Sequence, residues 1–256
     1  MSKRKRFIAT SITLSLGFVG IQFLPEQYRI ISIGLLGLLT LLLFFWSLKE
    51  GLGFNMTLIT LTLPLIFTLG VGFFWFLLPT SPLTRIPIVI FYGFGIYALC
   101  LTANIYTVSA IRTIALLRAA KGVGFVLTLL SFFLIFDTIL SLKWPIYLYA
   151  VTSILASFPL FFHGFWEVEL EKNFSRKVGR FSLIASVIMG EIAIAIFFWP
   201  TSVVVGSLFL TVASYVLLGL GQAELEGRLF SQTIREYLLV GLAVFIGMFF
   251  VTRWGG

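Results

Sequence analysis

The sequence predicts an all-α protein, a polytopic transmembrane helical bundle with its N-terminus in the cytoplasm. Three observations predict this class: the chain is 59% hydrophobic, its apolar runs are long and unbroken, and its Lys and Arg residues are unevenly distributed. Because only 11% of the 256 residues are charged, the chain cannot cover itself with a water-soluble surface. We therefore expect a multi-pass protein of the cell (inner or cytoplasmic) membrane, with the lipid bilayer as its first partner.

The apolar runs favour helices over a β-barrel. Lipid offers no hydrogen bonds to the backbone, so only helices and closed barrels can cross it, and barrel strands alternate apolar and polar residues. A helix needs about 20 apolar residues to span the hydrocarbon. Nine runs qualify, or eight if the short last run is re-entrant or interfacial. They are Phe7–Leu24, Ile30–Leu48, Met56–Leu78, Ile86–Val108, Gly122–Leu142, Pro145–Phe165, Phe181–Trp199, Thr201–Gly221 and Tyr237–Val251.

The basic residues give the orientation. With the N-terminus inside, nine spans leave 14 of the 18 Lys and Arg residues on the cytoplasmic side and four outside. The four outside are Arg29, Arg85, Lys143 and Arg253. Tryptophan, which prefers the headgroup region, lies near predicted span ends at all six of its positions. The short outer turns then make the chain a series of outward-pointing helical hairpins.

The chain is expected to form a single transmembrane domain over residues 1–256, with a candidate internal repeat. Shifting the sequence by 55 residues aligns Trp144-Pro145 with Trp199-Pro200. The copies would occupy about residues 121–175 and 176–230. Each would hold two spans, which makes the repeat parallel rather than inverted.

Two inner loops have the composition of surface segments. Residues 222–237 place charged side chains on one helical face and apolar ones on the other, which fits a helix lying on the membrane or an ordinary connector. The loop from Glu167 to Arg180 ends in basic residues at the level of anionic lipid headgroups, although the orientation rule alone also accounts for them.

Only two acidic residues, Glu191 and Asp137, lie inside predicted spans, and they form the candidate intramembrane polar site. Glu191 is near the middle of the seventh span and Asp137 is towards the outer end of the fifth. A charge at the bilayer centre is costly, so such residues often face the bundle interior and mark ion or proton paths. The surroundings favour a neutral, protonatable carboxyl at Glu191. The alternative is that each carboxyl only joins two helices by a hydrogen bond.

The small residues Ser182, Ser186 and Gly190 recur every fourth position beside Glu191, so a neighbouring helix could approach closely there. Elsewhere the inventory of reactive groups is thin. One histidine, His163, and one cysteine, Cys100, do not make a conventional metal site, and no metal or other cofactor is expected. The catalytic and phosphate-binding motifs are missing from the sequence, and the scattered basic residues form no nucleic-acid patch.

The segment from Asn104 to Gly124, NIYTVSAIRTIALLRAAKGVG, leaves the predicted membrane and re-enters it at once. Its basic residues Arg112, Arg118 and Lys121 are candidate contacts for lipid headgroups or for a partner, or they serve orientation alone. These twenty or so residues resemble a family of uncharacterised multi-span bacterial membrane proteins. The resemblance implies a location and a fold class, and it transfers no functional residues.

Three function classes follow. The first is a small permease-like or channel-like protein with Glu191 and Asp137 along a polar path. The second is a non-catalytic membrane scaffold or assembly subunit, with membrane protein partners, whose carboxyls fix helix packing. An enzyme acting on lipid-linked substrates ranks third, because the chain offers so few polar groups. A hydrated cavity around the carboxyls would favour the first class, whereas dry packing or lipid would favour the second.

Overall fold

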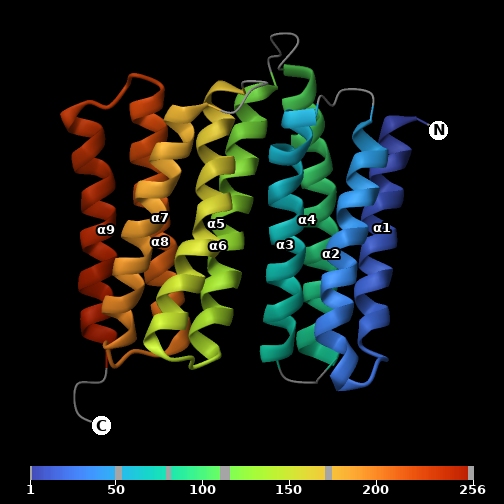
Figure 1. The fold of residues 1–256 in the computed structure, drawn as a ribbon, viewed down its shortest axis with the longest axis horizontal. Helices are drawn as coiled ribbons and strands as arrows, with labels where there is room; N and C mark the ends of the chain where they lie inside the picture. Colours follow the sequence, from blue (N-terminus) through green and yellow to red (C-terminus); the bar gives the residue numbers. More distant parts are fainter. Residues whose placement is uncertain (1, 50–53, 79–81, 110–115, 171–174, 253–256) are drawn as a thin grey trace. The chain divides into compact units, whose positions relative to one another are not determined.

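The fold is all-α, as the apolar runs predict. The structure is a computed structural model that describes residues 2–49, 54–78, 82–109, 116–170 and 175–252. This part of the chain forms nine α-helices and no strand (Figure 1). The helices are α1 (Lys3–Ile21), α2 (Glu26–Leu48), α3 (Phe54–Leu77), α4 (Pro82–Ser109), α5 (Leu117–Ser141), α6 (Ile146–Glu169), α7 (Arg176–Phe197), α8 (Val203–Leu225) and α9 (Ser231–Val251).

Each predicted span corresponds to one helix. Eight helices, α2 to α9, are long and apolar enough to cross a membrane. The last run was the doubtful one in the sequence, but α9 begins at Ser231 rather than Tyr237 and reaches 21 residues. The remaining helix is α1. It begins with four basic residues, KRKR, and these make it too highly charged to count among the eight.

Of the two interpretations of residues 222–237, a surface helix or an ordinary connector, the single surface helix is wrong. Helix α8 continues to Leu225, and α9 starts only five residues after Glu226. Between them Gly227 has a φ of 67°, in the left-handed region that glycine adopts without strain, and its N–H donates to the Glu224 carbonyl. The chain therefore turns back at the glycine.

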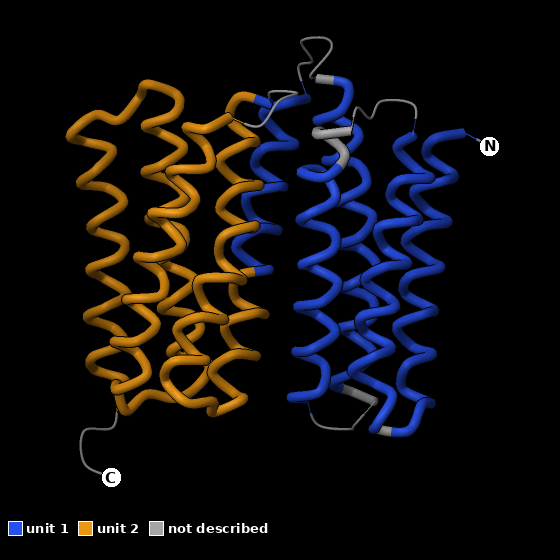
Figure 2. Tube along the Cα trace, in the orientation of Figure 1, with its two compact units in different colours: residues 1–131, 170–173 blue, residues 132–169, 174–256 orange. Residues whose placement is uncertain are grey.

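The described chain divides into two compact units, shown in Figure 2. Unit 1 comprises residues 1–131 with 170–173, and unit 2 comprises residues 132–169 and 174–256. The boundary passes through α5, whose first part belongs to unit 1 and whose second part belongs to unit 2.

Unit 1 is built on a four-helix arrangement in which α1 packs on α2 and α4, and α3 packs on the same two helices. An aromatic cluster fills its centre, where the ring of Phe18 lies 4.9 Å from Trp75 and 5.0 Å from Tyr92. Hydroxyl groups join the helices inside this apolar core. Thr68 of α3 lies within hydrogen-bond distance of Thr40 of α2, at 3.2 Å, and of the Tyr92 hydroxyl of α4, at 3.1 Å.

In unit 2, α6 packs along α7, and α8 packs on α6, α7 and α9. Glycines make these approaches close. A Cβ at Gly190 of α7 would clash with Ile154 of α6, and one at Gly221 of α8 would clash with the ring of Phe165. Helix α9 lies at the edge of the unit on α8 (Figure 1), and of its described residues only Met248 is fully buried.

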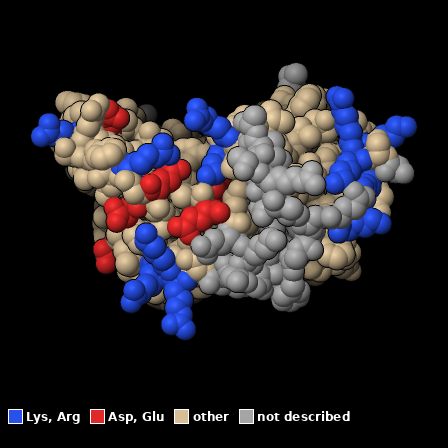
Figure 3. All heavy atoms as spheres, turned by 90° about the horizontal axis from the view of Figure 1, so that it is seen from above, with Lys and Arg blue, Asp and Glu red and all other residues tan. Residues whose placement is uncertain are grey.

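The charged side chains gather at helix ends. Figure 3 looks onto one set of ends: basic side chains lie over the start of α1 in unit 1, and acidic and basic ones mix over the helix ends of unit 2. In unit 2 these include the start of α7, where Arg176, Lys177 and Arg180 are exposed, and the turn after α8, where Arg228 pairs with Glu226. Between these ends the helices are mostly apolar.

Candidate functional site

Asp137 is part of the packing of unit 2. Its side chain on α5 is 5% exposed, and the Ser207 hydroxyl of α8 donates a hydrogen bond to Oδ1 at 3.2 Å. The same hydroxyl also lies 3.0 Å from the Val204 carbonyl. The carboxyl thus joins α5 to α8 within the packed interior. This arrangement fits the alternative in which the carboxyl only links two helices by a hydrogen bond.

Glu191 lies on the opposite kind of surface, the exposed face of α7. Ile184 and Val187, two turns and one turn earlier on this face, are 60% and 41% exposed. Among the described residues no hydrogen bond or ion pair reaches the Glu191 carboxylate, and none links it to Asp137. The two carboxyls that the sequence grouped are therefore separate features of the structure.

The small-residue ladder beside Glu191 faces the other way. Ser182 and Ser186 are fully buried and donate to carbonyls of their own helix at 2.7 and 2.6 Å, and Gly190 lies against Ile154. The ladder is the surface on which α6 packs. Glu191 borders it, since successive helix positions differ by about 100°.

The three candidate basic contacts near the α4–α5 connection are placed only in part. Arg112 lies outside the described residues. Arg118 is exposed in the first turn of α5, and Lys121, one turn later, is half-buried and already has an interaction within the chain. Helix α4 continues to Ser109, one residue past the predicted end of the fourth span at Val108.

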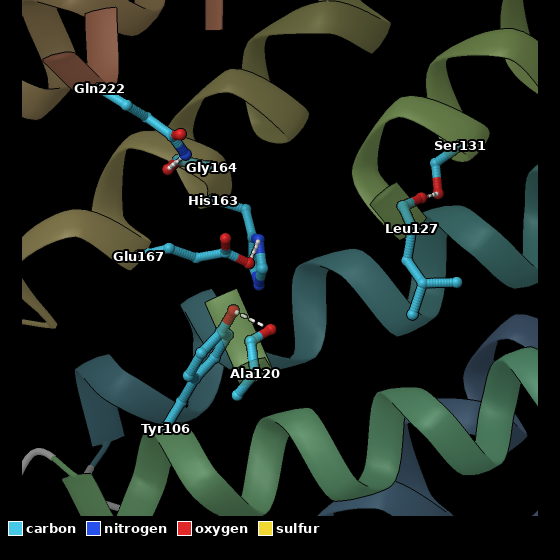
Figure 4. Close-up of polar contacts among 8 residues, drawn as sticks. All are labelled: Tyr106, Ala120, Leu127, Ser131, His163, Gly164, Glu167 and Gln222. Carbon is cyan, nitrogen blue, oxygen red and sulfur yellow. Dashed lines mark hydrogen bonds and ion pairs between the residues drawn. The ribbon is translucent and has the colours of Figure 1, made fainter. Parts of the chain in front are cut away.

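A buried polar pair that the sequence analysis missed lies on α6. His163 and Glu167, one turn apart on α6, face each other with Nδ1 and Oε1 3.2 Å apart, and both are almost fully buried (Figure 4). Beside them, Nε2 of Gln222 on α8 donates to the Gly164 carbonyl at 2.8 Å. The imidazole and the carboxyl can hold one proton between them, and either group can carry it.

The pair was missed because the sixth span was predicted to end at Phe165. That boundary leaves Glu167 in a loop, where its four-residue spacing from His163 carries no meaning. Since α6 continues to Glu169, the two side chains fall on one helix face. The spacing was visible in the sequence, but the helix end was not.

Figure 4 also shows two hydroxyl contacts in unit 1. The Tyr106 hydroxyl of α4 donates to the Ala120 carbonyl of α5 at 3.2 Å, and Ser131 donates to the Leu127 carbonyl of its own helix at 2.8 Å. Within the described residues, no three His, Cys, Asp or Glu side chains come together as a metal site. The described polar groups of both units therefore act chiefly between and along helices.

The comparisons with known proteins agree with the resemblance of the short Asn104–Gly124 segment to a family without an assigned activity. Neither the curated proteins nor the solved structures gave a match to the chain. One family model matches residues 9–251, which is nearly the whole chain. The bacterial origin that the resemblance implies stays a prediction. The chain belongs to the family described as "Protein of unknown function (DUF5656)".

Proposed function

We propose that this chain is a non-catalytic scaffold or assembly subunit of a membrane complex, and that the Glu191 face of α7 docks a helix of another membrane protein. The observation that carries the proposal is a carboxyl on an exposed, otherwise apolar helix face. Glu191 lies six residues, or about 9 Å, before the end of α7 at Phe197, within the apolar part of the helix.

Such a carboxyl is unfavourable in lipid. A charged side chain near the bilayer centre costs about 2.5–3.5 kcal/mol on insertion scales, and a neutral carboxyl there still lacks a hydrogen-bond partner. The described residues supply none. A transmembrane helix carrying a hydrogen-bond donor at the same depth would remove this cost, and Lys or Arg on that helix would add charge complementarity.

The second carboxyl also supports the scaffold class. Asp137 is buried against Ser207 of α8, where it serves the packing of unit 2. Helix α9 also exposes most of its residues, but lipid covers an apolar face as well as a neighbouring chain does, so this surface does not separate the two function classes.

Affinity purification of the full chain in mild detergent tests the proposal. We expect Glu191→Leu to reduce the yield of co-purifying membrane proteins about tenfold, which corresponds to the loss of about 1.4 kcal/mol. Glu191→Gln keeps the hydrogen-bonding capacity and should retain more of the partner. Glu224→Gln, on an exposed end of α8, removes the same charge outside the apolar region and should change nothing.

Equal recovery of partners by the wild type and Glu191→Leu would overturn the scaffold proposal. A chain that purifies alone in every mild detergent contradicts it as well. If the only partner recovered is a second copy of this chain, the docked helix is its own, and the proposal of a different membrane protein fails.

The second candidate function is the small permease-like or channel-like protein, and the buried His163–Glu167 pair favours it. A titratable pair inside a helical unit is a common element of proton-linked transport. Glu167→Gln keeps the size and hydrogen-bonding capacity of the side chain but removes its titration. In proteoliposomes that carry a pH gradient and an internal pH dye, this variant should lose any proton flux that the wild type shows. Glu191→Gln should behave in the same way if Glu191 lies on the path.

A further inference from the structure

A groove of about 520 Å³ runs between α1 and α4 on the surface of unit 1. Its floor consists of small residues, Ser11, Ser15 and Gly93. Ser11 Oγ donates to the Gly93 carbonyl at 2.6 Å, so the two helices meet closely at the floor. A Cβ at Gly93 would lie 2.7 Å from Ser15 Oγ, and the absence of a side chain there keeps the groove open.

The walls are large apolar side chains that project outward. Ile8, Ile12 and Leu16 of α1 are 42%, 54% and 66% exposed, and Ile90 and Phe94 of α4 are 54% and 71% exposed. The α1 wall follows the helix axis for eight residues, or about 12 Å. A narrow apolar channel parallel to a transmembrane helix has the direction and the chemistry of a lipid acyl chain.

One end of this channel is basic. Arg4 and Lys5 are exposed at the start of α1, and they lie four and three residues before Ile8, which places them one turn above the groove on the same face. Figure 3 shows the basic side chains gathered at this helix end. Tyr97, one turn past Gly93 on the antiparallel helix α4, brings a hydroxyl to the same end of the groove.

From this juxtaposition we propose that the α1–α4 groove binds one acyl chain of an anionic phospholipid, whose headgroup phosphate is held by Arg4 and Lys5. A docked protein helix would explain the apolar walls but not the two cations at the end of the channel. A zwitterionic lipid would fill the groove but would not be preferred. Each basic residue at a membrane surface raises the affinity for anionic lipid about fivefold.

The test measures lipid retention by the purified full chain in detergent, by native mass spectrometry with phosphatidylglycerol or phosphatidylcholine of identical acyl chains. We expect the wild type to prefer phosphatidylglycerol about 25-fold, as two such residues predict. The double variant Arg4→Gln/Lys5→Gln should lose that preference. Its matched control, Arg176→Gln/Lys177→Gln, removes two exposed charges from the start of α7 and should keep it.

A second pair of variants tests the groove itself. Phe94→Ala lowers one exposed wall and should weaken binding of both lipids several-fold, whereas Leu38→Ala removes an exposed side chain of α2 away from the groove and should have no effect. These positions are exposed, so helical content and melting temperature should match the wild type. The charge-keeping variant Arg4→Lys/Lys5→Arg should bind as the wild type does.

Three results would overturn the lipid site: equal retention of the two lipids, equal loss of preference in the α7 control, or full binding by Phe94→Ala. A lipid-resistant dimer that disappears in Phe94→Ala would assign the groove to a second copy of the chain instead. Competition by millimolar glycerol phosphate without any effect of Phe94→Ala would reduce the site to a phosphate contact, which also contradicts the proposal.

Discussion

At the scale of single residues, the polar groups of this apolar chain are used mostly between or along helices. Ser207 bonds Asp137 across two helices, Thr68 joins two neighbours of α3, and buried serines donate to carbonyls one turn back. Lipid offers no competing hydrogen bonds. However, the polar groups of the unfolded chain in the membrane also find hydrogen-bond partners, so each native bond adds little to stability. The exposed carboxyl of Glu191 departs from this pattern.

The bond between Asp137 and Ser207 should be measurable. A double-mutant cycle with Asp137→Ala and Ser207→Ala, followed by unfolding in detergent micelles, should give a coupling free energy of about 0.6 kcal/mol. The control cycle pairs Asp137→Ala with Ser214→Ala, since Ser214 bonds within α8 and to Met189. A coupling in the first cycle no larger than in the control would show that the bond contributes nothing.

Two glycines of α7 should respond differently to the same change. Gly190 lies against Ile154, whereas a Cβ at Gly179 would meet nothing within 4 Å. Gly190→Ala should lower the free energy of unfolding by about 1–3 kcal/mol, because an added methyl overpacks a tight contact. Gly179→Ala should leave it unchanged or slightly raised. Thermal unfolding of both variants checks this, and similar melting temperatures would contradict the close α6–α7 packing.

At the scale of elements, the exact ends of the helices decide which polar side chains share a helix face, and the apolar runs of the sequence do not define these ends. Helix α6 continues past Phe165 and so brings Glu167 onto the face of His163, whereas Gly227 ends the α8 region and begins a turn. At the other end of α9, Trp199 Nε1 donates to Thr252 Oγ1 at 2.8 Å, which fastens this peripheral helix to the end of α7. This bond adds to the packing of α9 on α8.

Removal of the tryptophan N–H should loosen the end of α9. In Trp199→Phe the amides near Met248 and Thr252 should exchange hydrogen several-fold faster, because the loss of a hydrogen bond worth about 1 kcal/mol makes local opening more frequent. Trp144→Phe, at a tryptophan that is 37% exposed in the α5–α6 turn, serves as the control. Unchanged exchange in α9 would show that its packing on α8 alone holds the helix.

At the scale of the whole molecule, two compact units and eight helices of membrane-spanning length describe an integral membrane protein. The orientation stays a prediction: the distribution of Lys and Arg predicts the start of α1 and the α8–α9 turn on the cytoplasmic side and the α5–α6 turn on the outside. The parallel repeat over residues 121–175 and 176–230 stays a prediction.

Cysteine labelling of intact cells tests that orientation. In a Cys100→Ala background, cysteines at positions 143 and 228 should react from opposite sides of the membrane, because three helices separate them. A cysteine at position 4 should react from the same side as one at 228, because eight helices intervene. If positions 4 and 228 react from opposite sides, α1 does not cross the membrane.

The sequence by itself predicted nine helical runs, or eight spans if the last run did not cross, and placed each run within a few residues of a helix in the described part of the chain. Length and apolarity suffice for this, since a backbone in lipid must satisfy its hydrogen bonds within each helix. The sequence did not predict which face of each helix points to lipid and which to the protein interior. Both surroundings are apolar, so an apolar run of residues does not distinguish them. Only the tertiary structure turned Asp137 inward and Glu191 outward, and only it opened the groove between α1 and α4.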